Sequence, residues 1–224
     1  MKLSQRLRAI ADRIEQGSRV ADIGTDHAYL PIALFESGRC RRIIACDVRR
    51  KPLENARKNC AEYGANGVEL RLGDGLSALA PGEADTIVVA GMGGDVIVSI
   101  LDGCRWIRDP GIRLILQPMT SAEVLRCYLA EKGYQVDSET AVADEGRIYP
   151  ILCVHYDGIH RELLSGEEYI GKIRNQTPEN RAYLQKQAQR VEHTAEQLSA
   201  VAGKENEKAA LTAAGMAIRS ILEE

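Results

Sequence analysis

Four acidic or glycine-rich segments follow apolar runs in the sequence, and their side chains could bind a small ligand. They are Asp22-Ile23-Gly24-Thr25-Asp26-His27, Cys46-Asp47, Gly73-Asp74-Gly75 and Gly91-Met92-Gly93-Gly94. Carboxylates accept hydrogen bonds from hydroxyl and amino groups, and glycines let a ligand approach the backbone. Asp47 follows Gly24 by 23 residues, close to the spacing at which an acid after a second strand binds a ribose diol. Asp74 could accept a hydrogen bond from an adenine amino group. The pattern predicts a nucleoside-containing ligand.

The first of these segments discriminates between two classes of cofactor. A dinucleotide places a pyrophosphate at a glycine-rich turn, but Asp26, His27 and Ala28 occupy positions where that fingerprint has further glycines. S-adenosylmethionine has no phosphate and carries a positive sulfonium and a positive ammonium group. Unit charges about 4 Å apart interact by about 4 kcal/mol at an effective dielectric constant of about 20, so the sign of the charge matters. The acids Asp22 and Asp26 therefore favour S-adenosylmethionine and oppose NAD or FAD.

These segments require a parallel sheet to bring them together. Short apolar runs, separated by helical patterns, occupy residues 19–24, 42–48, 68–73, 86–91 and 112–117. Such runs are typical of parallel strands buried on both faces, whose carboxyl ends share one edge. Runs at 134–143 and 147–156, separated by Asp144-Glu145-Gly146, predict an antiparallel hairpin. An amphipathic stripe over residues 3–14 predicts a first helix that ends at 16–18. The prediction is an α/β fold with a seven-stranded, mostly parallel sheet.

The last third of the chain has a different pattern. A heptad seam is followed, after Gly203-Lys204-Glu205-Asn206, by a second seam; the two consist of Leu184, Ala188, Val191, Ala195, Leu198 and Ala202, and of Leu211, Ala214, Ile218 and Ile221. Two seams joined by a short polar break predict an antiparallel helical hairpin, a coiled-coil arm. We expect a methyl-donor-binding domain at 1–158 and the helical domain at 159–224. The arm is either a packing or dimerisation element, or it binds a large substrate.

Composition excludes several classes of protein. The apolar fraction of 45% and charged fraction of 27% are ordinary for a globular domain, and no stretch reaches the roughly 20 apolar residues of a membrane span. The start of the chain, residues 1–8, is too polar for a signal peptide, so we expect a cytoplasmic protein. The six cysteines are scattered, which predicts neither a metal site nor a disulfide framework. The net charge of −3 requires any nucleic-acid contact to be a local patch.

Several segments together resemble a known family. The segments are "LSQRLRAIADRI", "VADIGTDHAYLPI", "ACDV", "GDGL", "VVAGMGG", "LQPM" and "EGRIYPI". Together they are similar to the bacterial tRNA (adenine-22-N1)-methyltransferases, and the resemblance runs through the entire chain. It implies a Rossmann-like S-adenosylmethionine-dependent methyltransferase fold and methyl transfer to N1 of an adenine in the D-arm region of tRNA. The implied cofactor-contacting residues are Gly24, Asp26, His27, Asp47, Asp74, Gly75, Gly91 and Met92, with Asp22 orienting the turn. His27 could instead be a hydrogen-bonded structural group.

The segment after the fourth strand is consistent with a ring nitrogen as the target. Methyltransferases that modify an exocyclic adenine amine commonly carry an Asn/Asp-Pro-Pro-aromatic turn there, whereas this chain has Gly91-Met92-Gly93-Gly94. Adenine N1 already presents a lone pair, so its methylation needs positioning more than deprotonation, although other ring targets would also lack the motif. N1 lies on the Watson–Crick edge, and a paired base must be exposed before it reacts. Tyr29 and Tyr149 are candidates for positioning the adenine, or they are packing residues.

Basic residues offer contacts to an RNA backbone. The first half of the arm carries Lys172, Arg174, Arg181, Lys186 and Arg190, and a second basic stretch surrounds the second predicted strand with Arg39, Arg41, Arg42, Arg49, Arg50, Lys51, Arg57 and Lys58. We expect these arm residues to bind tRNA. We expect the protein itself to be a monomer or a weak homodimer. The alternatives are a small-molecule or other RNA methyltransferase of the same fold, a non-catalytic RNA-binding protein, and an NAD-dependent oxidoreductase, which Asp26 disfavours.

Overall fold

The computed structural model describes residues 1–199 and 201–224 and contains a seven-stranded sheet. Its strand order is β3-β2-β1-β4-β5-β7-β6; the first five strands are parallel, and β7 runs antiparallel to β5 and β6. The strands are β1 (Arg19–Ile23), β2 (Arg42–Asp47), β3 (Val68–Leu72), β4 (Thr86–Gly93), β5 (Arg113–Thr120), β6 (Tyr134–Asp144) and β7 (Arg147–Tyr156). The predicted mostly parallel sheet with an antiparallel hairpin is confirmed.

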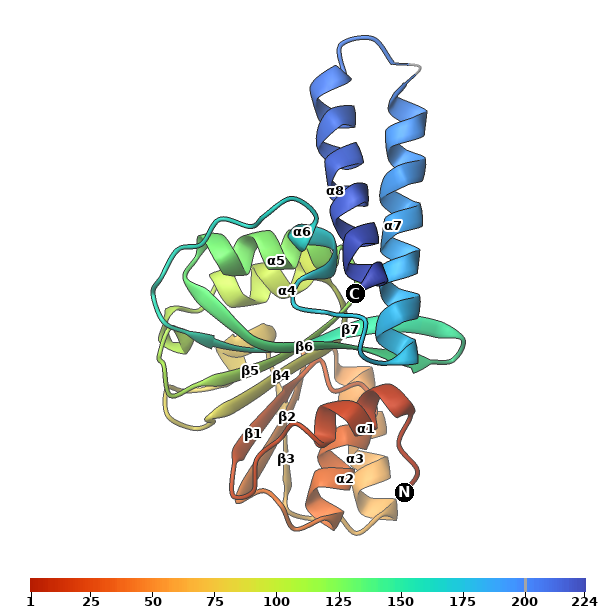
Figure 1. The fold of residues 1–224 in the computed structure, drawn as a ribbon. Coiled ribbons are helices and arrows are strands. Elements are labelled where there is room, and N and C mark those ends of the chain that lie inside the picture. Colours follow the sequence, from red (N-terminus) through yellow and green to blue (C-terminus); the bar gives the residue numbers. More distant parts are fainter. Residues whose placement is uncertain (200) are drawn as a thin grey trace.

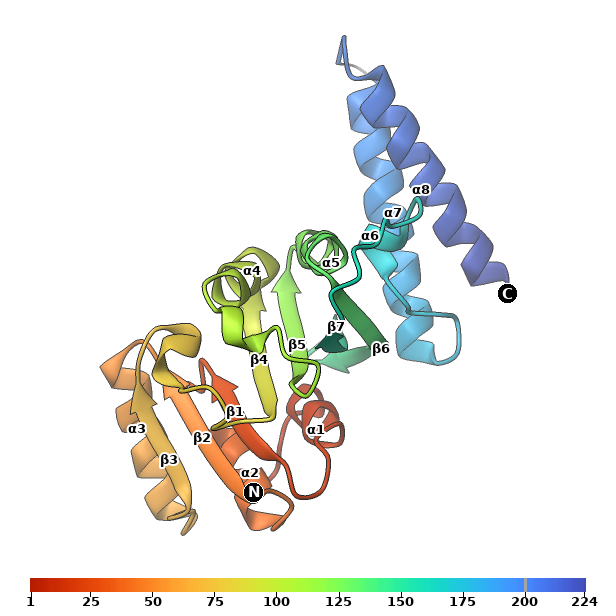
Figure 2. The ribbon, with the colours of Figure 1, turned by 90° about the vertical axis from the view of Figure 1, so that its left-hand side faces the viewer.

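Helices cover both faces of this sheet, as Figure 2 shows. One face carries α1 (Gln5–Ala11), α2 (Tyr29–Glu36) and α3 (Arg50–Glu62), and the other carries α4 (Gly94–Asp102) and α5 (Ala122–Glu131). Short 3-10 helices, η1 (Gly75–Ala78) and η2 (Arg105–Ile107), lie in the connections. Successive strand residues point to opposite faces, so Val88 packs with the core under α1 and α2 while Val89 packs with the core under α4 and α5.

The order in which the chain adds strands to the sheet reverses between β1 and β4. β1 pairs with β2 on one side and β4 on the other, so the connections after β1 and β4 diverge at this point. Open α/β sheets bind ligands in the crevice at such a switch point, beyond the carboxyl ends of the strands. The topology therefore places the four acidic or glycine-rich segments at the edge where a ligand site is expected.

Two predicted boundaries differ from the structure. The first helix ends at Ala11 rather than near residue 16, because Arg13 and Ile14 donate their backbone N–H groups three residues back and tighten the chain into turns. Ile14 is nevertheless buried, as the apolar stripe predicts. In the hairpin, β6 extends through Asp144, and only Glu145 and Gly146 form the loop. Both have positive φ, 48° and 73°, as a two-residue type I′ turn requires.

The C-terminal helices form a hairpin that projects beyond the β6 edge of the sheet (Figure 1). After α6 (Glu167–Ile170), α7 (Pro178–Leu198) and α8 (Glu205–Glu223) pack side by side. The core between them contains Leu184, Ala188, Val191, Ala214 and Ile218. The predicted hairpin is present, and a coiled coil stays a prediction.

The heptad seam is shorter than its sequence pattern. Ala195 is buried, but Leu198 is only half-buried and Ala202 is exposed and lies outside both helices. Extending the seam to Ala202 was therefore wrong, whereas Leu198 is the last residue of α7. The cause is the end of α7 at Leu198, because Ala202 lies beyond it and before α8.

A buried ionic network joins the hairpin to the sheet. Arg126 of α5 donates from Nε to Glu139 Oε1 of β6 at 2.9 Å, and both side chains are almost fully buried. Arg126 also donates from Nη2 to the hydroxyl of Tyr183 on α7 at 3.0 Å, and from Nη1 to the carbonyl of Tyr169 at 2.8 Å. Because this guanidinium contacts α6, α7 and β6 at once, it fixes how the hairpin is seated.

Candidate functional site

A pocket of about 510 Å³ lies at the carboxyl edge of the sheet, at the switch point. This volume is in the range of pockets that bind small molecules and cofactors. Seven of the residues proposed for the cofactor line it: Gly24, Asp26, Asp47, Asp74, Gly75, Gly91 and Met92. They come from the ends of four different strands, so the fold brings together residues that are up to 68 positions apart in the sequence.

The first turn of the site has an unusual backbone. Gly24, Asp26 and Ala28 all have positive φ, at 79°, 46° and 57°. Aspartate tolerates this region better than most residues, whereas alanine does so at an energetic cost. The N–H groups of Gly24 and Thr25 both donate to the carbonyl of Cys46, at 2.8 and 2.9 Å, and tie the turn to the end of β2. The turn thus holds the Asp26 carboxylate at the pocket.

Asp47 and Asp74 are placed differently around the pocket. Asp47 is buried at the end of β2, and its Oδ1 accepts the backbone N–H of Arg49 at 2.8 Å. That contact orients the carboxylate and leaves Oδ2 available to a ligand hydroxyl. Asp74 and Gly75 follow β3, and Gly75 has a φ of 52°. A side chain at Gly75 would approach Ile100 to 3.3 Å, so this wall is formed by backbone.

Asp22 lies beneath the pocket rather than in its wall. It is the fourth residue of β1 and is buried, and burial raises its pKa to about 6. The nearby Thr25 hydroxyl and Arg6 guanidinium lower the pKa of Asp22, partly offsetting the burial. A carboxylate held this way is a charged group with little solvent to stabilise it, so a cation nearby would favour its ionised form.

The first turns of α4 supply pocket residues that the sequence pattern did not single out. Asp95, Val96, Ser99 and Ile100 also line the pocket. Asp95 directly follows the glycine cluster and lies in the first turn of α4. An acid at that position is also explained by its favourable interaction with the helix dipole, so the sequence alone does not indicate a ligand contact. Their role at the site becomes visible only when α4 is placed against β4.

The three aromatic candidates lie outside the pocket lining. His27 and Tyr29 are stacked, with ring centroids 5.3 Å apart, and His27 Nε2 lies 3.5 Å from Asp26 Oδ2. Tyr29 is 41% exposed, so its ring is open to a large substrate. Tyr149 is 8% exposed in β7 and is paired with Val142 in the hairpin. The structure thus separates Tyr29, on the surface, from Tyr149, which packs in the sheet.

β4 has a bulge where it borders the pocket. Ala90 pairs with Gln117 and Met92 with Pro118, so Gly91 is an extra residue between them. Met92 reaches the first turn, since a β-carbon on Gly24 would lie 2.0 Å from Met92 Cε. Two residues near this bulge were absent from the sequence-based site: the fully buried Gln117 of β5, and Arg6 of α1, whose Nη1 lies 2.7 Å from Gln117 Oε1.

Some basic residues of the arm contact other parts of the protein, and others are exposed to solvent. Arg190 forms an ion pair with Glu123 and lies over the ring of Tyr169 at 5.9 Å, and Arg174 donates to the carbonyl oxygens of Gly171 and Ile173. Arg181 and Lys186 are exposed on α7 and form no ion pair within the part of the chain that the structure describes. Lys172 is also exposed, near the sheet junction.

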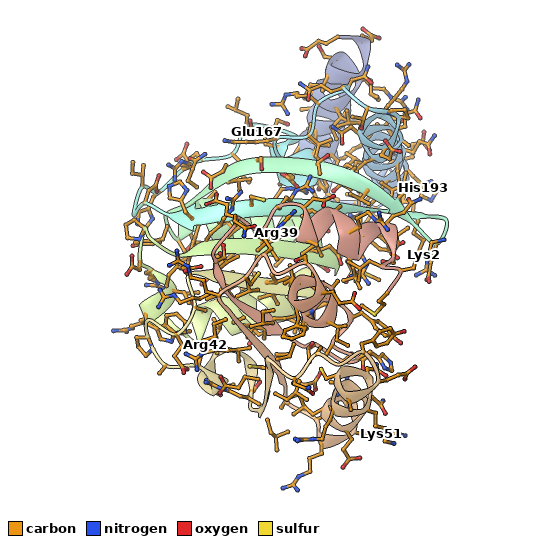
Figure 3. All side chains as sticks on the ribbon, turned by 90° about the horizontal axis from the view of Figure 1, so that it is seen from below. Lys2, Arg39, Arg42, Lys51, Glu167 and His193 are labelled. Carbon is orange, nitrogen blue, oxygen red and sulfur yellow. The ribbon has the colours of Figure 1, made fainter. Side chains whose placement is uncertain are left out.

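The second basic stretch does not form one surface. Arg39 donates to the carbonyl of Ala11 at 3.0 Å, and Arg42 pairs with Glu69 and Glu83 at 2.9 and 3.0 Å. Arg42 begins β2 and Lys51 follows its other end, and Figure 3 shows the two side chains well apart. Proximity in sequence therefore overstated this patch.

Neither a metal cluster nor a membrane helix is found in the described ranges. Within residues 1–199 and 201–224, no group of three or more His, Cys, Asp or Glu side chains is arranged to hold a metal ion. Over those same ranges, no helix combines the length and apolarity required to cross a bilayer.

Comparisons with known proteins identify the family. Residues 3–152 match the family model described as "Methyltransferase domain". The chain is 34% identical over 219 residues to the tRNA (adenine(22)-N(1))-methyltransferase of Bacillus subtilis, covering 93% of this chain and 90% of that protein. The solved structure of the B. subtilis M1A22 tRNA methyltransferase TrmK superposes with a TM-score of 0.81 at 30% identity, over 99% of this chain and 97% of that one. Streptococcus pneumoniae Sp1610, solved in complex with S-adenosyl-L-methionine, has a TM-score of 0.82 at 31% identity, over 99% and 100% of the two chains. The pocket, the sheet order and these similarities lead to one conclusion: the chain belongs to the tRNA (adenine(22)-N(1))-methyltransferase family.

Proposed function

We propose that this protein transfers a methyl group from S-adenosylmethionine to N1 of adenine 22 in tRNA, the position named for its B. subtilis relative. The observation that carries the proposal is the pocket at the switch point, where Asp26, Asp47 and Asp74 surround a cavity bordered by glycine backbone. The relative from S. pneumoniae, which binds S-adenosyl-L-methionine, has the same fold over the whole chain.

The residues of the pocket fit S-adenosylmethionine. The carboxylate of Asp47 offers its Oδ2 to a ribose diol, and Asp74 offers an acceptor to an adenine amino group. Asp26 in the pocket wall and Asp22 beneath it place negative charge around the first turn, which favours a cationic ligand and opposes a pyrophosphate. The cofactor-binding set is therefore Asp22, Gly24, Asp26, Asp47, Asp74, Gly75, Gly91 and Met92, with His27 as an outer contact through Asp26.

The reaction requires positioning rather than a strong base. When bound, S-adenosylmethionine supplies an electrophilic methyl group that the lone pair of adenine N1 can take. The protein's contribution is to expose the base and orient N1, which is the role we assign to the exposed Tyr29 ring. The burial of Tyr149 favours a packing role for that residue, so Tyr29 is the stronger of the two candidates for contact with adenine.

The helical domain provides the second part of the proposed mechanism. We divide the chain into a methyl-donor-binding domain at 1–158 and a helical domain at 159–224. Arg181 and Lys186 project from α7 without an internal partner in the described chain, so they are available to tRNA phosphates. Lys172 lies near the junction between the domains, beside residues of α5 and β6, and is a further candidate for contact with tRNA. Arg174 and Arg190 are held by internal contacts and contribute less. Because the proposed substrate is tRNA, we also propose a cytoplasmic location for the enzyme.

A pair of tRNA transcripts tests the proposed function. One carries adenine at position 22 and the other guanine, and each is incubated with the protein and methyl-labelled S-adenosylmethionine. We expect label in the adenine-22 transcript only. Equal labelling of both transcripts would place the target elsewhere, and labelling of neither would favour a small-molecule methyltransferase of the same fold.

A further inference from the structure

The Gly91 bulge sets the position of Met92 at the pocket. Gly91 has a φ of 79° and no partner in the β4–β5 register, and Met92, the next residue, extends to Gly24. Bulges bend a strand and redirect the following side chain, and they are frequent beside active sites. Any shift of the bulge would therefore move Met92 at the wall formed by the first turn.

Gln117 of β5 supplies the bulge with the hydrogen bond that the ladder does not provide. The Gln117 side chain is 0% exposed, and its Oε1 accepts the backbone N–H of Gly91 at 3.1 Å. Its Nε2 donates to the carbonyl of Pro118 at 2.9 Å. Rotating the amide by half a turn would bring its NH₂ group against the Gly91 donor and its oxygen against the Pro118 acceptor. The bulge therefore depends on one orientation of this amide.

Arg6 reinforces that orientation from the outside. Its Nη1 donates to the same Gln117 oxygen at 2.7 Å, and its Nε lies 3.5 Å from Asp144 Oδ2 at the end of β6. The Arg6 side chain is only 20% exposed. Asp144 also accepts the backbone N–H of Gln5, which anchors the start of α1 at the same place. A second donor on the amide oxygen makes the rotated orientation still less favourable.

We propose that Arg6 and Gln117 are positioning residues for methyl transfer, which act by fixing the Gly91 bulge and, through it, Met92 against Gly24. This inference rests on the proposed function. Neither residue lines the pocket, so their effect is on the geometry of its wall rather than on ligand contacts. Misplacement by about 1 Å can slow an enzymatic step by about a hundredfold, so a displaced bulge should affect the transfer step most.

The kinetic test compares two arginines on the same short helix. Arg6→Leu removes the guanidinium and keeps an apolar side chain, and Arg8→Leu makes the same change at an exposed position without an ion pair in the described chain. We expect Arg6→Leu to slow single-turnover methyl transfer at saturating tRNA and cofactor by about tenfold or more, with a KM for tRNA changed by less than about threefold. Arg6→Lys, which keeps a donor, should recover part of the rate, and Arg8→Leu should match the parent protein.

A second readout does not depend on activity. The chain has four methionines, so methyl-¹³C methionine labelling gives a simple NMR spectrum. The Met92 methyl signal should move in Arg6→Leu and Gln117→Leu, and stay unchanged in Arg8→Leu, without tRNA or cofactor. A merely structural role would lower the melting temperature and leave both the Met92 signal and the rate per folded molecule unchanged, and that result would overturn the proposal. If the parent protein fails to methylate tRNA, the proposed function fails, while the Met92 signal still decides whether Arg6 and Gln117 hold the bulge.

Discussion

Met92 lies directly against Gly24: a β-carbon built on Gly24 would stand 2.0 Å from Met92 Cε. Gly24 also has a φ of 79°, a conformation that residues with a β-carbon rarely adopt. The turn after β1 and the bulge in β4 therefore form one wall of the pocket, although 68 positions separate the two residues in the chain.

Replacing Gly24 should weaken cofactor binding in addition to lowering stability. In Gly24→Ala the new methyl group forces Met92 aside, and we expect affinity for S-adenosylmethionine to fall by about tenfold or more in calorimetry. The control is Gly82→Ala, because Gly82 has a φ of 82° but nothing within 4 Å of its would-be β-carbon. Both variants should lose about 1–2 kcal/mol of unfolding free energy from backbone strain, and only Gly24→Ala should lose affinity. Equal affinities of the two variants for S-adenosylmethionine would mean that Met92 can move aside without disturbing the cofactor site.

The buried carboxylate of Asp22 should make stability depend on pH. Its pKa is raised from 3.8 to about 6, so the folded protein holds this proton more tightly than the unfolded chain does. The unfavourable contribution of ionised Asp22 is therefore fully present above about pH 6 and disappears as the pH falls toward 4. We expect Asp22→Asn to raise the free energy of unfolding at pH 8, by about 3 kcal/mol at most, with a difference that vanishes near pH 4. Exposed Asp12→Asn is the control, and a gain independent of pH would contradict the burial argument.

The network at Arg126 should determine whether the hairpin stays on the sheet. Glu139→Gln leaves a buried guanidinium without its countercharge, and we expect a loss of about 3–5 kcal/mol in urea unfolding. Glu192→Gln breaks the exposed Glu192–Arg219 pair, whose side chains are 39% and 46% exposed, and should cost about 1 kcal/mol or less. Similar losses in the two variants would show that the buried pair does not hold the junction.

The free basic face of α7 should contribute to tRNA binding. The double variant Arg181→Glu with Lys186→Glu should raise the KM for tRNA and reduce its dependence on salt, because phosphate contacts release counterions. Affinity for S-adenosylmethionine should not change. The matched variant Arg57→Glu with Lys58→Glu makes the same change in charge on α3, at the opposite edge of the sheet. If the α3 variant raised the KM for tRNA equally, general electrostatic attraction, and not a binding surface on α7, would explain the effect.

Much of this architecture could be predicted because it depends on local pattern. Apolar runs set the strands, and the acids after them, such as Asp47 and Asp74, lie at the pocket because parallel strands end at one edge. The roles of Arg6 and Gln117 could not be predicted, since they depend on a bulge and on the packing of α1 against β6. Likewise, an arginine's charge is visible in sequence but its partner is not, as the Arg190–Glu123 pair illustrates. The seam through Ala202 failed because a repeat does not show where its helix ends.

The identity of the methylated atom tests the central claim most directly. Unmodified bacterial tRNA is incubated with the protein and labelled S-adenosylmethionine, digested to nucleosides and separated by chromatography with mass detection. We predict that label appears in 1-methyladenosine, at one residue per tRNA that carries adenine at position 22. Label in N6-methyladenosine or in another nucleoside, or its absence across a complete tRNA pool, would contradict it.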